Sequence, residues 1–323
     1  MDVALVGLRV LREVAETGSF TAAAHSLGYT QSAVSRQVAA LEQAVGQRLF
    51  ERHRGGAQLT PAGRALLRHA AVALDAVDAA RAELSGQGRR PAPFRLGITP
   101  VAAASLLPGA LARMQRRAPQ ASVRTRDGTS GSLLRALRAG TLDAALLTSR
   151  PPHRAPDGDS PPLRVEPLLD TLLSVAVPST GRFSGRSEVE VGELAGEAWI
   201  SSSATGGEPV LGVWPGIPGR PQVAHLSRDW LAKLQLVAAG AGITTVPAAM
   251  GGVVPEGARL VRLQGVPEEW RRVSWVSRPG PEGEIDSMLL GALRDQVALL
   301  PGAAVPGPPS GPGGPTTAPA VNP

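Results

Sequence analysis

Apolar residues recur at helical spacing in three short stretches near the start of the chain. The first helix is predicted to end at Thr17-Gly18, and Ser19 is placed to cap a second, short helix over Phe20–Leu27. Gly28-Tyr29 then turns the chain, and Thr30 can cap a third helix. The inward-facing positions are Leu5, Leu8, Leu11 and Val14 in the first helix, and Val34, Val38, Leu41 and Val45 in the third.

Small and flexible polar residues occupy the opposite face of the third helix. Gly46 closes this helix, and Leu49-Phe50 and Gln58–Thr60 can pair as short strands around a basic tip at 52–56. Helix, turn, helix and basic hairpin together predict a winged helix-turn-helix. The outward polar residues are Gln31, Ser32, Ser35 and Arg36.

Such a face can approach the major groove of DNA, because small side chains let the helix backbone come close while longer ones reach base edges. Gln31 suits an adenine edge, and Arg36 suits a guanine or a phosphate. The two arginines of the wing suit the adjacent minor groove or its phosphates. The alternative is a solvated helix face beside a charged hairpin, but face, turn and wing occur together and favour DNA. The candidate DNA-binding set is Thr30, Gln31, Ser32, Ser35, Arg36, Arg52, Arg54 and Thr60.

A long helix is predicted from Pro61 to about Leu84, because proline is favourable just inside a helix capped by Thr60. Its apolar residues follow an alternating three-four spacing, which predicts a seam for a partner helix and hence a dimer. The alternative is that this seam packs on the chain's own domain; the linker-like stretch 85–93 that follows favours the dimer. The seam residues are Leu67, Ala70, Leu74, Val77 and Leu84.

From Phe94 onward, predicted strands alternate with predicted helices, which indicates an α/β region with a parallel sheet covered on both faces. A proline-rich break at 150–162 and a return of the chain after 266 predict two lobes, with residues 92–162 and 267–300 in lobe I and 163–266 in lobe II. The expected domains are therefore 1–60, 61–91 and 92–300. The Pro/Gly-rich tail 301–323 is expected to be disordered.

The composition and the missing motifs limit which kinds of functional site the chain can have. The net charge is +6 and comes almost entirely from arginine, with Lys233 the only lysine. The chain has no cysteine, which excludes disulfides, thiolate metal sites and thiol redox sensing. The five histidines lack metal-ligand spacing, and no catalytic, P-loop or dinucleotide motif is present, so we expect neither an enzyme nor a cofactor or metal site. The absence of a signal peptide or membrane-spanning stretch predicts a cytoplasmic protein without a membrane partner.

The run VAETGSFTAAAHSLGYTQSAVSRQVAALEQAVGQRLFERHRGGAQLTPAGRALL closely resembles the N-terminal domain of LysR-type transcriptional regulators. The segments FRLGITPVAAASLLP and LRAGTLDAALL resemble the effector domain of the same family, so the resemblance extends over roughly residues 3–300. It implies a dimer of dimers on dyad-symmetric promoter DNA, two periplasmic-binding-protein-like lobes, and a small co-inducer that alters DNA bending. RNA polymerase is a further candidate partner.

The resemblance also implies an effector site between the lobes. Thr99-Pro100 and Gly128-Thr129-Ser130 each precede a predicted helix, and helix N-termini favour anions, so an organic carboxylate would suit them. The alternative is that Thr99 and Thr129 are ordinary helix caps. The Gly/Ser/Pro-rich stretch 201–220 departs from the family pattern where lobe II would supply contacts. The matching positions are Thr99, Pro100, Val101, Thr129, Ser130, Ser202, Ser203 and Thr244 to Val246.

The leading hypothesis is a transcription factor whose DNA binding responds to a small molecule. Its main alternative is a DNA-binding regulator whose effector domain no longer responds to a ligand. A solute-binding protein or enzyme with an incidental helix-turn-helix is disfavoured, because neither a signal peptide nor catalytic residues are found.

Overall fold

The computed structural model describes residues 3–53, 56–84, 93–151, 163–202, 212–217, 219–281 and 283–300. The N-terminal region holds α1 (Leu5–Thr17), α2 (Phe20–Leu27) and α3 (Gln31–Val45), followed by the antiparallel hairpin of β1 (Phe50–His53) and β2 (Gly56–Leu59). This is the predicted winged helix-turn-helix.

The ends of these helices follow from the capping residues seen in the sequence. The Ser19 hydroxyl accepts a hydrogen bond from the backbone N–H of Ala22, and Thr30 caps α3 in the same way. Each of the three helices is followed by a glycine in the left-handed region, with φ of 69°, 68° and 71°, which ends the helix at no steric cost. These glycines are Gly18, Gly28 and Gly46.

The long helix α4 (Pro61–Leu84) has the predicted bounds, but three of its five seam residues, Leu67, Ala70 and Leu74, pack inside their own chain. Leu67 and Leu74 are fully buried in one hydrophobic cluster with α1 residues such as Leu11 and Val14. This is the arrangement that the alternative interpretation of the seam expected. A different face of α4 remains exposed, including Val72, whose exposed fraction is 69%.

The C-terminal region is organised by one eight-stranded sheet in the order β4-β3-β5-β12-β6-β11-β7, with β10 paired to β6. A separate two-stranded sheet joins β8 to β9. The strands are β3 (Phe94–Ile98), β4 (Val123–Asp127), β5 (Ala144–Ser149), β6 (Arg164–Pro178), β7 (Glu188–Glu190), β8 (Ala198–Ser201), β9 (Gln222–Leu226), β10 (Thr244–Pro247), β11 (Ala258–Gln264) and β12 (Trp270–Ser277).

The sheet is mixed rather than wholly parallel, which corrects the sequence expectation. Strand β3 runs parallel to β4 and β5, but β12 is antiparallel to both β5 and β6. The strand β6 is 15 residues long and passes through both lobes: its first half pairs with β12 and its second half with β10 and β11.

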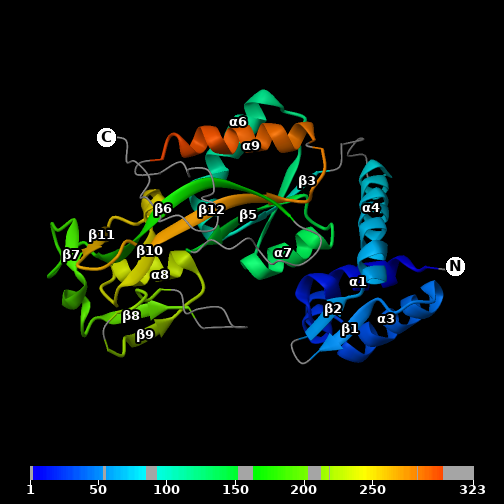
Figure 1. The fold of residues 1–323 in the computed structure, drawn as a ribbon, viewed down its shortest axis with the longest axis horizontal. Helices are drawn as coiled ribbons and strands as arrows, with labels where there is room; N and C mark the ends of the chain where they lie inside the picture. The colour runs from blue at the N-terminus through cyan, green and yellow to red at the C-terminus, as the bar shows by residue number, and fades with distance from the viewer. Residues whose placement is uncertain are drawn as a thin grey trace, which may run out of the picture.

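Helices cover both faces of the lobe I part of the sheet. Figure 1 shows α6 (Leu107–Arg117) and α9 (Glu284–Val297) on one face and α7 (Ser130–Arg138) on the other. The chain forms α5 (Pro100–Ser105) and then α6, with a break between them at Leu106. Pro108 explains the break, because it has no N–H to continue the hydrogen-bond ladder. Lobe II contains α8 (Trp230–Ala238) and the 3-10 helices η1 (Val191–Leu194) and η2 (Ala248–Val253).

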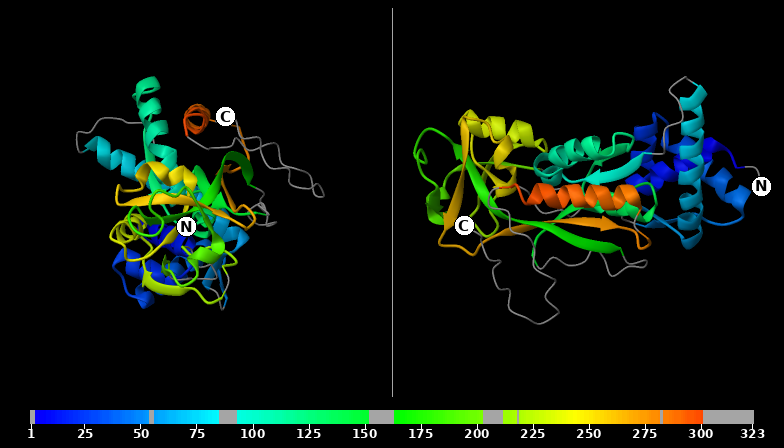
Figure 2. Two further views of the ribbon diagram at one scale, coloured as in Figure 1. Left: turned by 90° about the vertical axis from the view of Figure 1, so that its left-hand side faces the viewer. Right: turned by 90° about the horizontal axis from the view of Figure 1, so that it is seen from above.

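The views of Figures 1 and 2 place the winged domain with α4 at one end of the molecule, lobe II at the other end, and lobe I between them. One hydrophobic cluster crosses between the lobes, joining Leu146 and Trp275 of lobe I to Leu234 and Val246 of lobe II. Within the described ranges, no helix combines the length and apolar character needed to cross a membrane.

Candidate functional site

The outward face of α3 presents the predicted polar residues at the protein surface. Gln31, Ser32 and Arg36 are exposed, and Ser35 is half-buried. The Gln31 side-chain amide donates a hydrogen bond to the Ser35 hydroxyl at 3.0 Å, so these two side chains are held together. The buried side of the same helix is apolar, with Val34, Val38 and Leu41 in the core. The face is therefore fixed in orientation by the packing behind it.

The threonines at either end of the DNA-binding segment have structural partners. Thr30 caps α3, and its hydroxyl lies 3.1 Å from that of Ser32. The Thr60 hydroxyl donates to the carbonyl of Arg48 at 2.7 Å and accepts from the backbone N–H of Gly63 at 2.9 Å, so Thr60 joins the wing to α4. Arg52 lies on β1. The Arg52 side chain and the whole of Arg54 lie outside what the structure describes.

In lobe I, the structure gathers predicted residues around the carboxyl end of β5. Thr99 is buried, and its hydroxyl donates to the carbonyl of Leu146 at 3.0 Å and lies 2.8 Å from the hydroxyl of Thr148. The Ser130 hydroxyl donates to the carbonyl of Thr148 at 3.2 Å. Thr148 is thus the link between the two predicted segments, and the sequence analysis missed it because it lies at the end of a strand without a motif.

The neighbouring lobe I positions divide between helix capping and packing. The Thr129 hydroxyl accepts from the backbone N–H of Ser132, as the helix-cap alternative expected. The Thr99 side chain makes no such bond to α5, because its hydroxyl turns toward β5 instead. Pro100 is exposed at the start of α5, and Val101 is buried behind it.

In lobe II, Ser202 follows β8 and contacts the only lysine of the chain. The Lys233 ammonium donates to the Ser202 hydroxyl at 2.7 Å and lies 5.0 Å from the centre of the Trp230 ring. The Ser202 hydroxyl in turn donates to the carbonyl of Ser227 at 3.2 Å. Burial lowers the pKa of Lys233 to about 8, because the charged form loses its hydration. The sequence analysis gave no signal for Lys233, because it lies on α8, far along the chain from Ser202.

The other predicted lobe II positions are not brought into this group. Thr244 is fully buried, and its hydroxyl donates to the carbonyl of Ile200 at 2.7 Å. It therefore ties β10 to β8. Ser203 lies outside the described residues.

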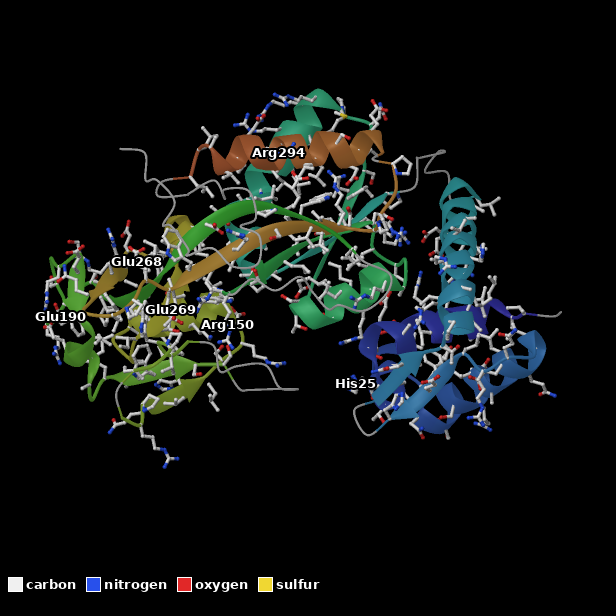
Figure 3. All side chains as sticks on the ribbon, viewed as in Figure 1. His25, Arg150, Glu190, Glu268, Glu269 and Arg294 are labelled. Carbon is white, nitrogen blue, oxygen red and sulfur yellow. The ribbon has the colours of Figure 1, made fainter. Side chains whose placement is uncertain are left out.

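Two arginines lie where β5 ends and the lobes meet. Arg150 directly follows β5 and is exposed; it is labelled in Figure 3. Arg272 of β12 is paired in register with Ser149 and forms a two-pronged ion pair with Asp170 of β6, with both N–O distances 2.7 Å. Asp170 is only 6% exposed, so this pair is largely removed from water.

No feature of the described residues suggests catalysis. In the ranges that the structure describes, no group of His, Asp and Glu side chains could hold a metal ion. His25, labelled on α2 in Figure 3, is exposed, as is His69 of α4. Trp199 belongs to the lobe II core, with an exposed fraction of 1%.

Two family models match the chain. The model described as "Bacterial regulatory helix-turn-helix protein, lysR family" matches residues 5–64, and the "LysR substrate binding domain" model matches residues 87–289. A probable hydrogen peroxide-inducible genes activator of Mycobacterium avium is 31% identical over 279 residues, which are 85% of this chain and 88% of that protein. The chain belongs to the LysR family of transcriptional regulators.

Other LysR-type relatives agree with this assignment. The HTH-type transcriptional regulator TfdS of Cupriavidus pinatubonensis is 31% identical over 254 residues, covering 76% of this chain and 83% of the relative. Among solved structures, CbnR in complex with its target DNA superposes with a TM-score of 0.53 at 24% identity, covering 91% of this chain and 99% of the other. A full-length OxyR variant from Pseudomonas aeruginosa gives a TM-score of 0.53 at 20% identity, covering 93% and 99%. These two structures share the fold, from the winged helix-turn-helix to the effector region.

Proposed function

We propose that this LysR-type regulator binds a specific DNA sequence through α3 and the wing, and that a small organic anion bound in the 92–300 region controls it. The observation that carries the DNA-binding part is the exposed polar face of α3, with Gln31 and Arg36 held at the surface by the apolar core behind them. In this proposal residues 1–60 bind DNA, 61–91 link and dimerise, and 92–300 bind the effector. The chain is a regulator and catalyses no reaction.

A selection experiment tests the DNA-binding part. The full chain is incubated with a library of random duplexes, and bound duplexes are enriched over several rounds. We expect a sequence with two related half-sites, since each winged domain of a dimer would contact one of them. Enrichment without any common sequence would contradict sequence-specific binding.

Basic groups in both lobes support an anionic effector. Arg272 is already paired with Asp170. Arg150 follows β5 and is exposed, and the Lys233 ammonium contacts Ser202 in lobe II. An anion between the lobes would interact favourably with this positive charge. A peroxide signal read through a thiol is excluded for this chain, because it has no cysteine.

The alternative, a regulator that does not respond to a ligand, has one observation in its favour. The hydroxyls of Thr99 and Thr244 are both bonded to carbonyls of their own chain. Thermal unfolding of the full chain with benzoate, succinate and similar acids separates the two hypotheses. A saturable rise in the unfolding temperature supports an effector site; no shift with any acid, together with unchanged DNA binding, supports the alternative.

The exposed face of α4 supports self-association. Val72, Ala76 and Ala80 recur every four residues, Ala73 lies beside Val72, and all four are exposed. Small apolar residues along one side of a helix allow a second helix to approach closely. We propose that two chains pair through this face, and that two such dimers form a tetramer on DNA.

A further inference from the structure

Lobe I contacts the winged domain of its own chain through α7. Ala139, directly after α7, is only 1% exposed and belongs to the hydrophobic cluster of the winged domain and α4. One turn earlier, the Arg135 side chain lies against Gly18: a Cβ placed on this glycine would be 3.5 Å from Nε of Arg135. The Gly18 carbonyl also accepts a hydrogen bond from the N–H of Ala57 in the wing. Arg135 therefore rests on the residue where α1 meets the wing.

An ion pair closes the same junction. The Arg126 guanidinium of β4 donates to the Glu16 carboxylate of α1 at 2.5 Å. Glu16 is only 8% exposed. A carboxylate so far removed from water needs a charged partner, and lobe I supplies it.

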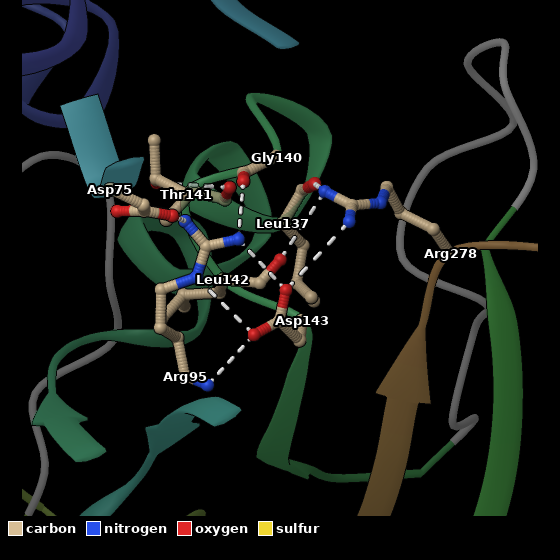
Figure 4. A network of polar contacts seen from close by, with 9 residues as sticks. Asp75, Arg95, Leu137, Gly140, Thr141, Leu142, Asp143 and Arg278 are labelled. Atoms are coloured by element: carbon tan, nitrogen blue, oxygen red, sulfur yellow. Dashed lines mark hydrogen bonds and ion pairs between the residues drawn. The ribbon is translucent and has the colours of Figure 1, made fainter. Parts of the chain in front are cut away.

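A second ion pair reaches the long helix. Arg95 of β3 bonds to both carboxylate oxygens of Asp143 and to the carbonyl of Gly140, all in lobe I (Figure 4). Its remaining terminal nitrogen pairs with Asp75 of α4 at 3.0 Å. Burial lowers the pKa of Arg95, but the hydrogen bond and charges of Asp143 and the charge of Asp75 raise it above the usual value. The guanidinium is thus anchored in lobe I and extended toward α4.

The two ion pairs match opposite charges on the two surfaces, whereas Arg68 of α4 lies near Arg278 of lobe I and is a like charge. The lobe I side contributes three arginines, and the side of α1 and α4 contributes two carboxylates. The arginines are Arg95, Arg126 and Arg135; the carboxylates are Glu16 and Asp75. Ala139 adds a buried apolar contact between the same two surfaces.

We propose that lobe I carries a dock for the winged domain of the same chain, built from Arg95, Arg126, Arg135 and Ala139. The dock holds the winged domain and lobe I as one body. Its helix α7 is capped by Thr129 and begins at Ser130. Two residues proposed for the effector and two residues of the dock, Arg135 and Ala139, therefore lie toward opposite ends of one helix. The role of Thr129 and Ser130 rests on the proposed function; the dock itself does not.

Distances between spin labels test the dock directly, because the chain has no cysteine of its own. Labels are placed by Gln43→Cys on α3 and Gln115→Cys on α6, both exposed positions. The full chain is mixed with excess unlabelled chain, so that only distances within one chain are measured by double electron–electron resonance. We expect one narrow distance peak without DNA or effector.

Two variants, compared with the parent chain, decide the outcome. Combined Glu16→Gln and Arg126→Gln should cause loss of the narrow peak, because the buried ion pair is gone. Arg124→Gln, an exposed arginine on the same strand, should leave the peak unchanged. A broad distribution in the parent chain, a narrow peak that survives the double substitution, or a peak that disappears on dilution with unlabelled chain would each overturn an intrachain dock. Duplex binding is measured separately, so a failure of the dock is distinguishable from a failure of the proposed function.

Discussion

Two side chains proposed for the effector site form hydrogen bonds to the backbone of their own chain. The Thr99 hydroxyl bonds to β5, and the Thr244 hydroxyl bonds to β8. The sequence analysis singled out both residues, but it could not give the direction of their hydroxyls. That direction depends on neighbours such as Leu146 and Ile200, which are distant in sequence, so it could not be predicted from local pattern.

Thr99→Val should lower the free energy of unfolding by about 1 to 2 kcal/mol, because it removes a buried hydroxyl with two partners. Thr125→Val, on the exposed side of β4, is the matched control and should change stability by less than about 0.5 kcal/mol. Urea unfolding measures both. Equal stability of the two variants would contradict the structural role of Thr99.

Lys233 gives a pH-dependent prediction. Its pKa is lowered from 10.5 to about 8 in the folded chain, so between these values the unfolded lysine holds a proton that the folded one has lost. Stability should therefore rise with pH across this window, by at most about 3 kcal/mol. Lys233→Met should lack this rise. The test is to measure the unfolding free energies of the parent chain and Lys233→Met from pH 7 to 10.5. A difference between them that does not change with pH would contradict the burial of the ammonium.

The Asp170–Arg272 pair predicts a large loss of stability. Arg272→Met leaves the Asp170 carboxylate, only 6% exposed, without its partner, and should cost about 3 kcal/mol. Arg150→Met, at an exposed position nearby, is the control and should cost little. Chemical unfolding of the two variants checks this, and a similar small effect for both would show that the pair is solvated.

At the scale of elements, the sequence predicted best where a helix carries its own boundary signals. Ser19 and Thr30 as caps, with glycines after the helices, placed α2 and α3 correctly. Pairing between distant strands carries no such signal. The first half of β6, and β9 and β11, were therefore missed, since their partners come from far along the chain.

The seam of α4 shows the same limit. Its three-four pattern predicted a seam for a partner helix. Leu67 and Leu74 are instead buried in a cluster with α1 of the same chain, and Leu84 is 88% exposed. A periodic pattern identifies which face is covered, whereas the identity of the covering surface is a property of the whole fold.

Val72→Glu should weaken self-association about tenfold or more, because it places a charge on the exposed apolar face of α4. Val253→Glu makes the same change at an exposed valine of lobe II, which is 43% accessible, and should leave the association state unchanged. Analytical ultracentrifugation over a range of concentrations measures both. If both variants still associate like the parent chain, the dimer contact lies elsewhere.

At the scale of the whole molecule, the two lobes share more than their connecting segments. β6 and β12 run through the sheet, and the cluster containing Trp275 and Leu234 continues from one lobe into the other. The winged domain is joined to this body at Glu16, and α4 is joined to it at Asp75. The sequence predicted the winged domain, the long helix and the two lobes in their order along the chain. It did not predict these interdomain contacts, because they involve isolated charged residues that belong to no motif.

The central claim is that the polar face of α3 contacts base edges, and the most direct measurement is the affinity of variants for the selected duplex by fluorescence anisotropy. Arg36→Ala should weaken binding to that duplex by about 1 to 3 kcal/mol, while Gln43→Ala, exposed on the same helix outside the proposed face, should bind like the parent chain. Circular dichroism confirms that both variants are folded. Unchanged affinity of Arg36→Ala, or equal losses in both variants, would contradict the account.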